Sequence, residues 1–98
     1  MLDEIHAGDF YLACISRLLI TPYNYKVRLS RIETRLLAFL MHDPERIFAS
    51  EYIIENIWGY ASDSALRSVI YRLRRKIELN PTNPRYLQQM GEGYGFFP

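Results

Sequence analysis

The 98-residue sequence has few of the side chains that bind metals or form disulfide bonds. Its single cysteine, Cys14, excludes a disulfide scaffold, and its apolar neighbours predict a buried thiol in a reducing compartment. The two histidines, His6 and His42, belong to no HxxxH spacing, and no CxxC pair is present. The segment Gly91-Glu92-Gly93 lacks the lysine and the following helix of a phosphate-binding loop. We therefore expect no bound metal, no cofactor and no enzymatic activity.

Long apolar runs are also missing. The run from Phe10 to Ile20 is interrupted by Ser16 and Arg17 and is too short to span a bilayer. The acidic pair Asp3-Glu4 is incompatible with the start of a signal peptide. These absences predict a soluble, cytoplasmic protein, none of whose segments inserts into a membrane. A hydrophobic content of 49% is enough for one modest core, so we expect a single domain over residues 1–98.

Charge is distributed unevenly along the chain, although the net charge is only +1. Residues 63–76 carry five Lys or Arg against one acidic residue, which gives this segment a net charge of +4. Residues 1–62 have a net charge of −2 and residues 77–98 of −1. One basic patch on a slightly acidic body indicates a polyanion partner, because such binding depends on local rather than total charge.

The basic segment predicts an amphipathic helix. Its apolar residues recur at steps of three and four and form one buried stripe: Leu66, Val69, Ile70, Leu73 and Ile77. The outward side chains are small in the first turns and cationic or aromatic later: Ser64, Arg67, Ser68, Tyr71, Arg72, Arg74 and Arg75. Small side chains allow close approach to a DNA groove, and arginines reach phosphates and guanine edges. An ordinary solvated face is the alternative, since arginines near a helix C-terminus also complement the helix dipole.

The N-terminal third predicts strands. We expect a flexible tail over residues 1–7 and a small antiparallel sheet within residues 8–29. Its strands correspond to three short apolar or aromatic runs: Phe10–Cys14, Leu18–Thr21 and Tyr25–Leu29. Further along the chain, Ile47 and Phe48 predict a short extended link between two helices.

Local signals also predict where the first two helices begin and end. Ser30 and Glu33 form a capping box that starts a helix ending near Met41. Ser50 is the expected N-cap of the second helix, which Gly59 ends.

The basic helix follows almost at once and completes three helices over residues 30–79. Only Tyr60-Ala61 separates the second helix from the Ser62 or Asp63 cap of the third, which we expect to run to about Leu79. Two helices joined by so short a turn make a helix-turn-helix. Residues 86–97 then predict a hairpin that turns at Gly91-Glu92-Gly93, in the position of a wing.

Three sequence blocks appear in a particular order. They are Arg35-Leu36-Leu37 through Pro44-Glu45-Arg46, then Ile57-Trp58-Gly59, then Ile70 to Lys76 followed by Gly91-Glu92-Gly93-Tyr94. Over about residues 8–97 the chain resembles the winged-helix effector domain of OmpR/PhoB-type bacterial response regulators. Ser62-Asp63-Ser64-Ala65-Leu66 resembles the helix start of membrane-tethered ToxR/CadC-type activators, which carry this domain at the N-terminus. Because the hairpin closes the chain here, as in response regulators, we favour an excised or stand-alone response-regulator effector domain.

The resemblance implies an α+β winged helix-turn-helix fold with an N-terminal antiparallel sheet, three helices and a C-terminal β-hairpin wing. It further implies double-stranded DNA as the partner of a transcriptional regulator, with the third helix in the major groove. The wing, Gly91, Glu92, Gly93 and Tyr94, would occupy the adjacent minor groove, and two copies would bind tandem half-sites as a homodimer. Base-reading positions of the family fall on Ser64, Ala65, Ser68 and Val69, its basic positions on Arg72 and Arg74, and a backbone contact on Trp58. A core role is the alternative for Trp58.

The chain departs from the family pattern at the wing and at one loop. The family's wing arginines are replaced by Met90 and Gly95, and Glu92 adds a negative charge at the tip. The loop between the second and third helices, through which the family can contact RNA polymerase, is almost absent. Activation and repression both remain open.

A winged helix that binds another protein is the competing interpretation. The weakened wing and the eight tyrosines favour it. Salt dependence distinguishes the two, because groove binding weakens steeply with salt and a mostly apolar protein interface hardly responds.

Overall fold

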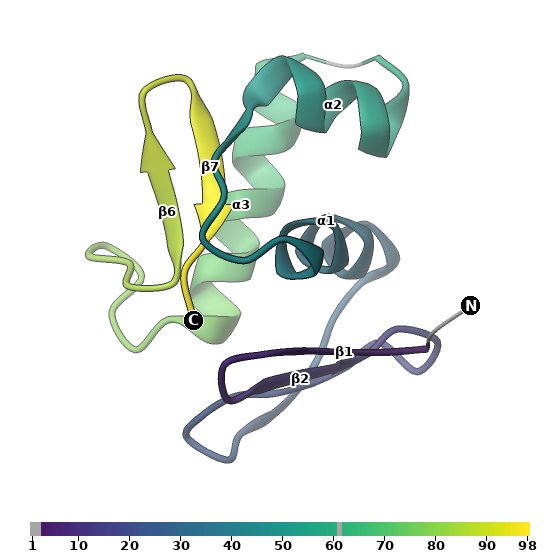
Figure 1. The fold of residues 1–98 in the computed structure, drawn as a ribbon, viewed down its shortest axis with the longest axis vertical. Coiled ribbons are helices and arrows are strands. Elements are labelled where there is room, and N and C mark those ends of the chain that lie inside the picture. The colour runs from purple at the N-terminus through teal and green to yellow at the C-terminus, as the bar shows by residue number, and fades with distance from the viewer. Residues whose placement is uncertain (1–2, 61) are drawn as a thin grey trace.

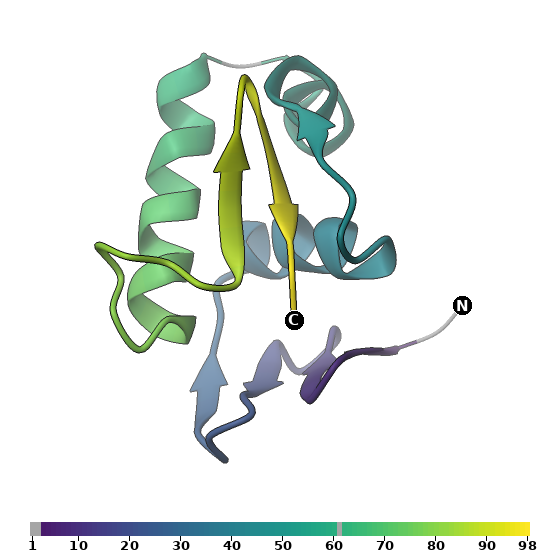
Figure 2. The ribbon, with the colours of Figure 1, turned by 60° about the vertical axis from the view of Figure 1, so that its left-hand side comes forward.

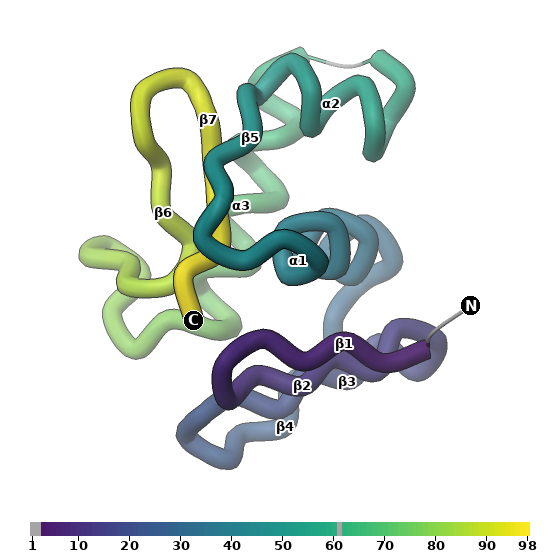
Figure 3. The backbone as a smooth tube through the Cα atoms, viewed as in Figure 1, coloured from purple at the N-terminus to yellow at the C-terminus, as the bar shows by residue number. Residues whose placement is uncertain are grey.

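The chain folds into two antiparallel sheets and three helices, and the computed structural model describes residues 3–60 and 62–98 (Figure 1). The first sheet has the order β1-β2-β3-β4: β1 (Glu4–Ala7), β2 (Phe10–Ala13), β3 (Leu18–Ile20) and β4 (Lys26–Arg28). The helices follow in sequence: α1 (Arg31–His42), α2 (Ser50–Trp58) and α3 (Asp63–Ile77). The second sheet has the order β5-β7-β6 (Figure 3): β5 (Phe48–Ala49), β6 (Leu87–Met90) and β7 (Gly93–Phe96). The predicted α+β winged helix-turn-helix is confirmed.

The N-terminal segment corrects one prediction. Residues 1–7 were expected to form a flexible tail, but Glu4–Ala7 pairs with β2 along its whole length. Ala7 is buried and Ile5 packs against the core, while Asp3 accepts the backbone N–H of Ile15 at 2.8 Å. Met1 and Leu2, also part of the expected tail, lie outside the described residues. The strand was missed because its four residues, EIHA, contain too little β-branched or aromatic character to predict a strand without its partner.

Cys14 is only half-buried, whereas the sequence predicted a buried thiol. Burial nevertheless raises the pKa of Cys14, and the negative charge of Asp3 raises it further. The thiol is therefore held in its protonated, less reactive form.

Helix α1 occupies the centre of the fold, because it packs against β1, α2, α3 and β7. The predicted capping box is confirmed: the Ser30 hydroxyl accepts the Glu33 N–H at 3.2 Å, and Glu33 accepts the Ser30 N–H at 2.8 Å. The inward stripe includes Leu36, Leu37 and Leu40, all fully buried. The helix ends at His42, one residue from the expected position.

One aromatic cluster joins the two sheets. The ring of Phe10 on β2 meets Tyr86 and Phe96 edge-on, with centroid distances of 4.8 and 4.9 Å. The Tyr86 hydroxyl also lies 2.6 Å from that of Tyr23. The N-terminal sheet is thereby packed onto the C-terminal sheet as well as onto α1.

The start of α2 differs from the prediction. The helix begins at Ser50, so Ala49 and not Ser50 is the N-cap, and no side chain caps this end of the helix. Its N–H and hydroxyl both bind the carbonyl of Glu92, at 2.9 and 2.8 Å. The expected extended link before α2 is a real strand, β5, which pairs with β7 through Phe48 and Tyr94. The helix ends at Trp58, just before Gly59 as predicted.

Helix α3 buries all five residues of the predicted apolar stripe. It ends at Ile77, two residues before the expected Leu79, because Glu78 leaves the helix and turns inward. The Glu78 carboxylate is buried and accepts the backbone N–H groups of Arg85, Tyr86 and Leu87 at 2.6 to 3.2 Å. Within the described ranges, none of the helices has the length and apolar character needed to cross a membrane.

The hairpin is closed by a two-residue turn, Gly91-Glu92, between the paired residues Met90 and Gly93. Gly91 has a φ of +58°, and a positive φ at the first central position alone is typical of a type II′ turn. The predicted wing is thus confirmed as a hairpin, with β5 added along the free edge of β7.

Candidate nucleic-acid interface

Helix α3 lies beside the wing, which we define structurally as β6, β7 and their connecting turn (Figure 2). The N-terminal end of α2 lies next to the wing tip, since Ser50 binds Glu92 there. Three segments that are distant in sequence therefore form one continuous surface. The rest of this surface is built from the outward side chains of α3.

Five of the predicted DNA-contacting side chains line one shallow depression, which we call the α3 depression: Ser64, Arg67, Ser68, Tyr71 and Arg72. All five are exposed. The small serines lie toward the N-terminal end of α3 and the larger side chains toward its C-terminal half, as the sequence predicted.

Most cations in the C-terminal half of α3 are engaged by the protein itself. Lys76 donates to Glu33 of α1 at 2.6 Å, and the Nε atom of Arg72 lies 3.5 Å from the other carboxylate oxygen. Arg75 donates to the hydroxyl of Tyr71 at 3.2 Å, with its guanidinium 5.7 Å from the ring centroid. Arg72 is still half exposed and can turn to another anion.

Arg74 does not have the outward orientation that the sequence predicted. Its Nε and Nη2 atoms both donate to the carbonyl oxygen of Leu87, at 3.2 and 3.0 Å. The side chain is half-buried and fixes β6 to α3. Arg74 therefore supports the wing, and its guanidinium is not directed into the α3 depression.

Three further family positions are less accessible than the resemblance implied. Val69 is only 3% exposed and belongs to the core, so little of its side chain is available at the surface of α3. Ala65 is half-buried. Trp58 is also half-buried and packs against the core at the end of α2, which agrees with the core alternative.

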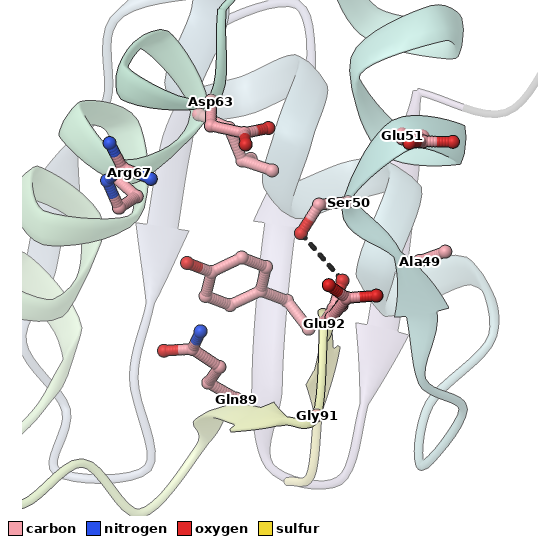
Figure 4. Close-up of a pocket in the computed structure, with 10 residues that line it drawn as sticks. Ala49, Ser50, Glu51, Asp63, Arg67, Gln89, Gly91 and Glu92 are labelled. Carbon is pink, nitrogen blue, oxygen red and sulfur yellow. Dashed lines mark hydrogen bonds between the residues drawn. The ribbon is translucent and has the colours of Figure 1, made fainter.

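A second hollow, of about 360 Å³, lies between α3, α2 and the wing (Figure 4). We call it the wing hollow. Arg67 and Asp63 reach it from α3, while Ser50, Glu51 and Glu92 lie across from them (Figure 4). Arg67 lines both the wing hollow and the α3 depression. The sequence placed Arg67 in the outward set, but did not indicate that it lines a hollow together with three carboxylates, those of Glu51, Asp63 and Glu92.

Glu33 connects α1 to the basic half of α3. Its carboxylate is only 2% exposed, yet it faces Lys76, Arg72 and the Ser30 N–H. Burial acts to raise the pKa of Glu33, but the hydrogen bonds from Lys76 and Ser30, together with the Lys76 charge, outweigh burial and hold the pKa below its ordinary value. Glu33 therefore remains ionised at neutral pH and fixes the position of α3.

The Glu33→Gln variant should lower the free energy of unfolding at pH 7 by about 1 to 2 kcal/mol, because it removes the charge that Lys76 faces. Since folding lowers the pKa of Glu33, its contribution is complete above the unfolded-state pKa of about 4.3 and is lost as pH falls through the folded-state value. Denaturant unfolding at pH 7 and at a pH well below about 4.3, under the lowered folded-state pKa of Glu33, should show the variant converging on wild type only in the more acidic measurement. Exposed Glu55→Gln is the matched control. If the difference in unfolding free energy between Glu33→Gln and wild type did not change with pH, the ionised Glu33 carboxylate would not be the source of the stability.

Two other expectations can be located. The connection between α2 and α3 comprises residues 59–62, and it includes Ala61, which lies outside the described residues, so contact with RNA polymerase there stays a prediction. Across residues 3–60 and 62–98, no group of three or more His, Cys, Asp or Glu side chains comes together in a way that could hold a metal ion.

The known proteins that this sequence resembles are transcriptional regulatory proteins. Residues 24–96 match the family described as "Transcriptional regulatory protein, C terminal". The chain is 37% identical over 76 residues to the transcriptional regulatory protein YrkP of Bacillus subtilis, a match covering 72% of this chain and 33% of YrkP. It is 33% identical over 79 residues to the DNA-binding response regulator MtrA of Mycolicibacterium smegmatis, covering 76% of this chain and 35% of MtrA. The chain thus spans about a third of the length of these relatives.

Solved structures show the same fold. Response regulator DrrB of Thermotoga maritima, an OmpR/PhoB homolog, superposes with a TM-score of 0.85 at 26% identity, covering 98% of this chain and 45% of DrrB. The DNA-binding domain of Klebsiella pneumoniae RstA, solved in complex with the RstA box, gives a TM-score of 0.81 at 23% identity, covering 98% of each chain. As its sequence blocks predicted, the chain belongs to the OmpR/PhoB-type family of C-terminal domains of transcriptional regulatory proteins.

Proposed function

We propose that this chain binds duplex DNA as a transcriptional regulator of the response-regulator type, with α3 in the major groove. The observation that carries the proposal is the exposed α3 depression, which combines small side chains with arginines on the one strongly basic segment of the chain. A major groove about 12 Å wide admits a helix, and Ser64 and Ser68 allow the backbone of α3 to approach base edges closely. The MtrA relative is named as a DNA-binding response regulator, and the RstA neighbour is a DNA-binding domain solved in complex with the RstA box, which supports this proposal.

The arginines of the C-terminal half of α3 are suited to phosphates. Arg72 and Arg75 are both exposed, and their present partners, Glu33 and Tyr71, leave them near the surface. Each phosphate that a cation neutralises contributes about −0.9 to the slope of log K against log salt. Positioning on the duplex would therefore come from these two residues.

The test is selection of bound duplexes from a random DNA pool, followed by titration of the selected site at several salt concentrations. Arg72→Ala combined with Arg75→Ala should weaken binding and reduce the magnitude of the salt slope by about two. Arg74 is left intact, because its loss would release β6. Arg31→Ala combined with Arg35→Ala removes the same charge from α1, in a hollow beside the N-terminal sheet, and should leave the slope unchanged. An unchanged slope in the α3 variant would refute groove binding by this face.

The wing provides a second test, because the negative charge of Glu92 at its tip should be repelled by the DNA phosphates. The Glu92 side chain is exposed, while the contacts of this residue with Ser50 use its backbone carbonyl, so Glu92→Arg should preserve the turn. We expect roughly tenfold tighter binding at low salt, about 1.4 kcal/mol, with a smaller gain at high salt. Glu92→Gln removes the negative charge without adding a positive one, so its affinity shows how much of the gain in Glu92→Arg comes from lost repulsion and how much from new attraction to phosphates. If neither variant binds more tightly at low salt, the wing is held away from the minor groove.

The structure also decides which family position can accept a new arginine. Gly95 is buried in β7, and a Cβ atom there would lie 2.5 Å from the carbonyl oxygen of Arg46 and 2.9 Å from the Ile47 side chain. An arginine at this position would therefore disrupt the sheet rather than report on DNA. Met90, at the other family position, is 51% exposed, and Met90→Arg is the suitable companion to Glu92→Arg.

A further inference from the structure

The five cations of α3 are not equivalent. Four are held by the protein: Arg72 and Lys76 by Glu33, Arg74 by the Leu87 carbonyl and Arg75 by Tyr71. Arg67 is the exception, since within residues 3–60 and 62–98 its side chain makes no hydrogen bond, ion pair or cation–π contact. Its guanidinium is therefore available to a ligand without breaking an internal contact.

Arg67 is also placed where the helix can come closest to a base pair. Ser64 and Ser68, three residues before it and one after, are small and exposed, and all three line the α3 depression. The larger Tyr71 and Arg72 lie further toward the C-terminal end of the helix. Because its neighbours Ser64 and Ser68 are short, the long side chain of Arg67 can extend beyond the helix surface toward a base in the groove.

The charges around Arg67 favour a base edge over a phosphate. Glu51, Asp63 and Glu92 line the wing hollow that Arg67 borders (Figure 4). Three carboxylates repel a phosphate from that side, whereas a base edge carries no net charge and is not repelled. Guanine alone presents two acceptors, O6 and N7, side by side in the major groove, which matches the fork of a guanidinium.

We propose that Arg67 is the specificity-determining residue of this domain and that it reads a guanine by donating two hydrogen bonds, to O6 and N7. This inference rests on the proposed function. Val69, at one of the family's base-reading positions, is buried in the core. Ser64 and Ser68 should distinguish bases less well than Arg67, because a hydroxyl can both donate and accept a hydrogen bond. Arg72 and Arg75 then position the helix, and Arg67 selects the sequence.

The experiment compares wild type, Arg67→Ala, Arg67→Lys and Arg75→Ala on the selected site and on all single-base-pair variants of it. Wild type should prefer one G·C pair by roughly 5- to 150-fold over the other pairs at that position. Arg67→Ala should remove this preference and leave preferences at other positions intact. Arg67→Lys keeps the charge without the planar fork and should weaken the preference without abolishing it, because an ammonium also donates to O6 and N7 but with less fixed geometry. Arg75→Ala, the matched control, should weaken binding to every sequence by a similar factor.

Base analogues identify the atoms involved. Replacing that guanine by 7-deazaguanine, which lacks N7, should weaken binding of wild type but not of Arg67→Ala. Hypoxanthine keeps O6 and N7 and lacks only the minor-groove amino group, so it should bind wild type as guanine does. Because Arg67 is exposed and makes no internal side-chain contact, its variants should fold, which circular dichroism and thermal unfolding can verify.

The outcomes separate the two proposals. If Arg67→Ala weakens binding to all sequences equally and keeps the preference for the G·C pair, Arg67 contacts a phosphate; this inference is then overturned while the proposed function stands. Equal binding of guanine and 7-deazaguanine by wild type would also overturn the inference. If wild type selects no duplex at all, the proposed function fails, and the inference fails with it.

Discussion

Replacing Glu78 by alanine should lower the free energy of unfolding by about 3 to 5 kcal/mol, a large share of the total stability of a domain of this size. The carboxylate is 7% exposed and accepts four hydrogen bonds from three consecutive backbone N–H groups, those of Arg85, Tyr86 and Leu87. Without it, these donors lose their acceptor where water has little access, and each unsatisfied donor costs about 1 to 3 kcal/mol. Chemical denaturation measures the loss, and hydrogen exchange of the three amides shows whether the start of β6 opens.

Two further variants make the Glu78 result specific. Glu55→Ala removes an exposed carboxylate from α2 and should change stability by no more than about 0.5 kcal/mol. Glu78→Gln keeps one acceptor oxygen and should be intermediate. If Glu78→Ala unfolds at the same denaturant concentration as Glu55→Ala, the carboxylate does not hold the wing in solution. Loss of DNA binding by Glu78→Ala at temperatures where it is folded would show that the wing's position matters for function.

The second large effect concerns half-site spacing. Productive binding should use two copies on adjacent half-sites. The wing of each copy carries Glu92 and no arginine, so it should add little to the affinity of a single copy for DNA. Inserting five base pairs turns one half-site by about half a helical turn and places the two copies on opposite faces of the duplex. Affinity should then fall by at least about tenfold, to that of a single half-site, since the second copy no longer raises the effective concentration of the first.

Titrations on four duplexes test the spacing prediction: a single half-site, the selected spacing, and the selected spacing lengthened by five or by ten base pairs. The ten-base-pair insertion is the matched control, because it lengthens the site by the same kind of sequence and returns both copies to one face. Binding there should recover in part. Equal affinity for the selected and the five-base-pair spacing would show that copies bind independently.

The candidate site was only partly visible in the sequence. Its apolar stripe and its exposed set of Ser64, Arg67, Ser68, Tyr71 and Arg72 followed from helical periodicity alone, because 3.6 residues per turn decide which positions share a face. The same rule gave no way to distinguish Arg74 from Arg72. Arg74 turns to a carbonyl 13 positions away on β6, and only the packed wing brings that carbonyl within 3.0 Å.

What the sequence determined by itself is the set of elements governed by neighbours a few residues apart. The Ser30–Glu33 capping box, the glycine after α2 and the turn at Gly91 each act over four residues or fewer, and each predicted its element correctly. Such signals are local hydrogen bonds and backbone dihedral preferences, which the chain expresses whatever its tertiary context.

Only the tertiary structure decided the roles of groups whose partners are distant in sequence. Ser50 binds Glu92 across 42 positions, Lys76 binds Glu33 across 43, and β1 gains its place only by pairing with β2. These contacts converted an expected N-cap into a support of the wing and an expected tail into a strand. The fold brought distant partners to Arg72, Arg74 and Lys76, and Tyr71 of the same helix holds Arg75, which leaves Arg67 as the free cation of α3 within the described residues. A side chain's identity fixes what it can bind, but the fold fixes which groups come within reach of it.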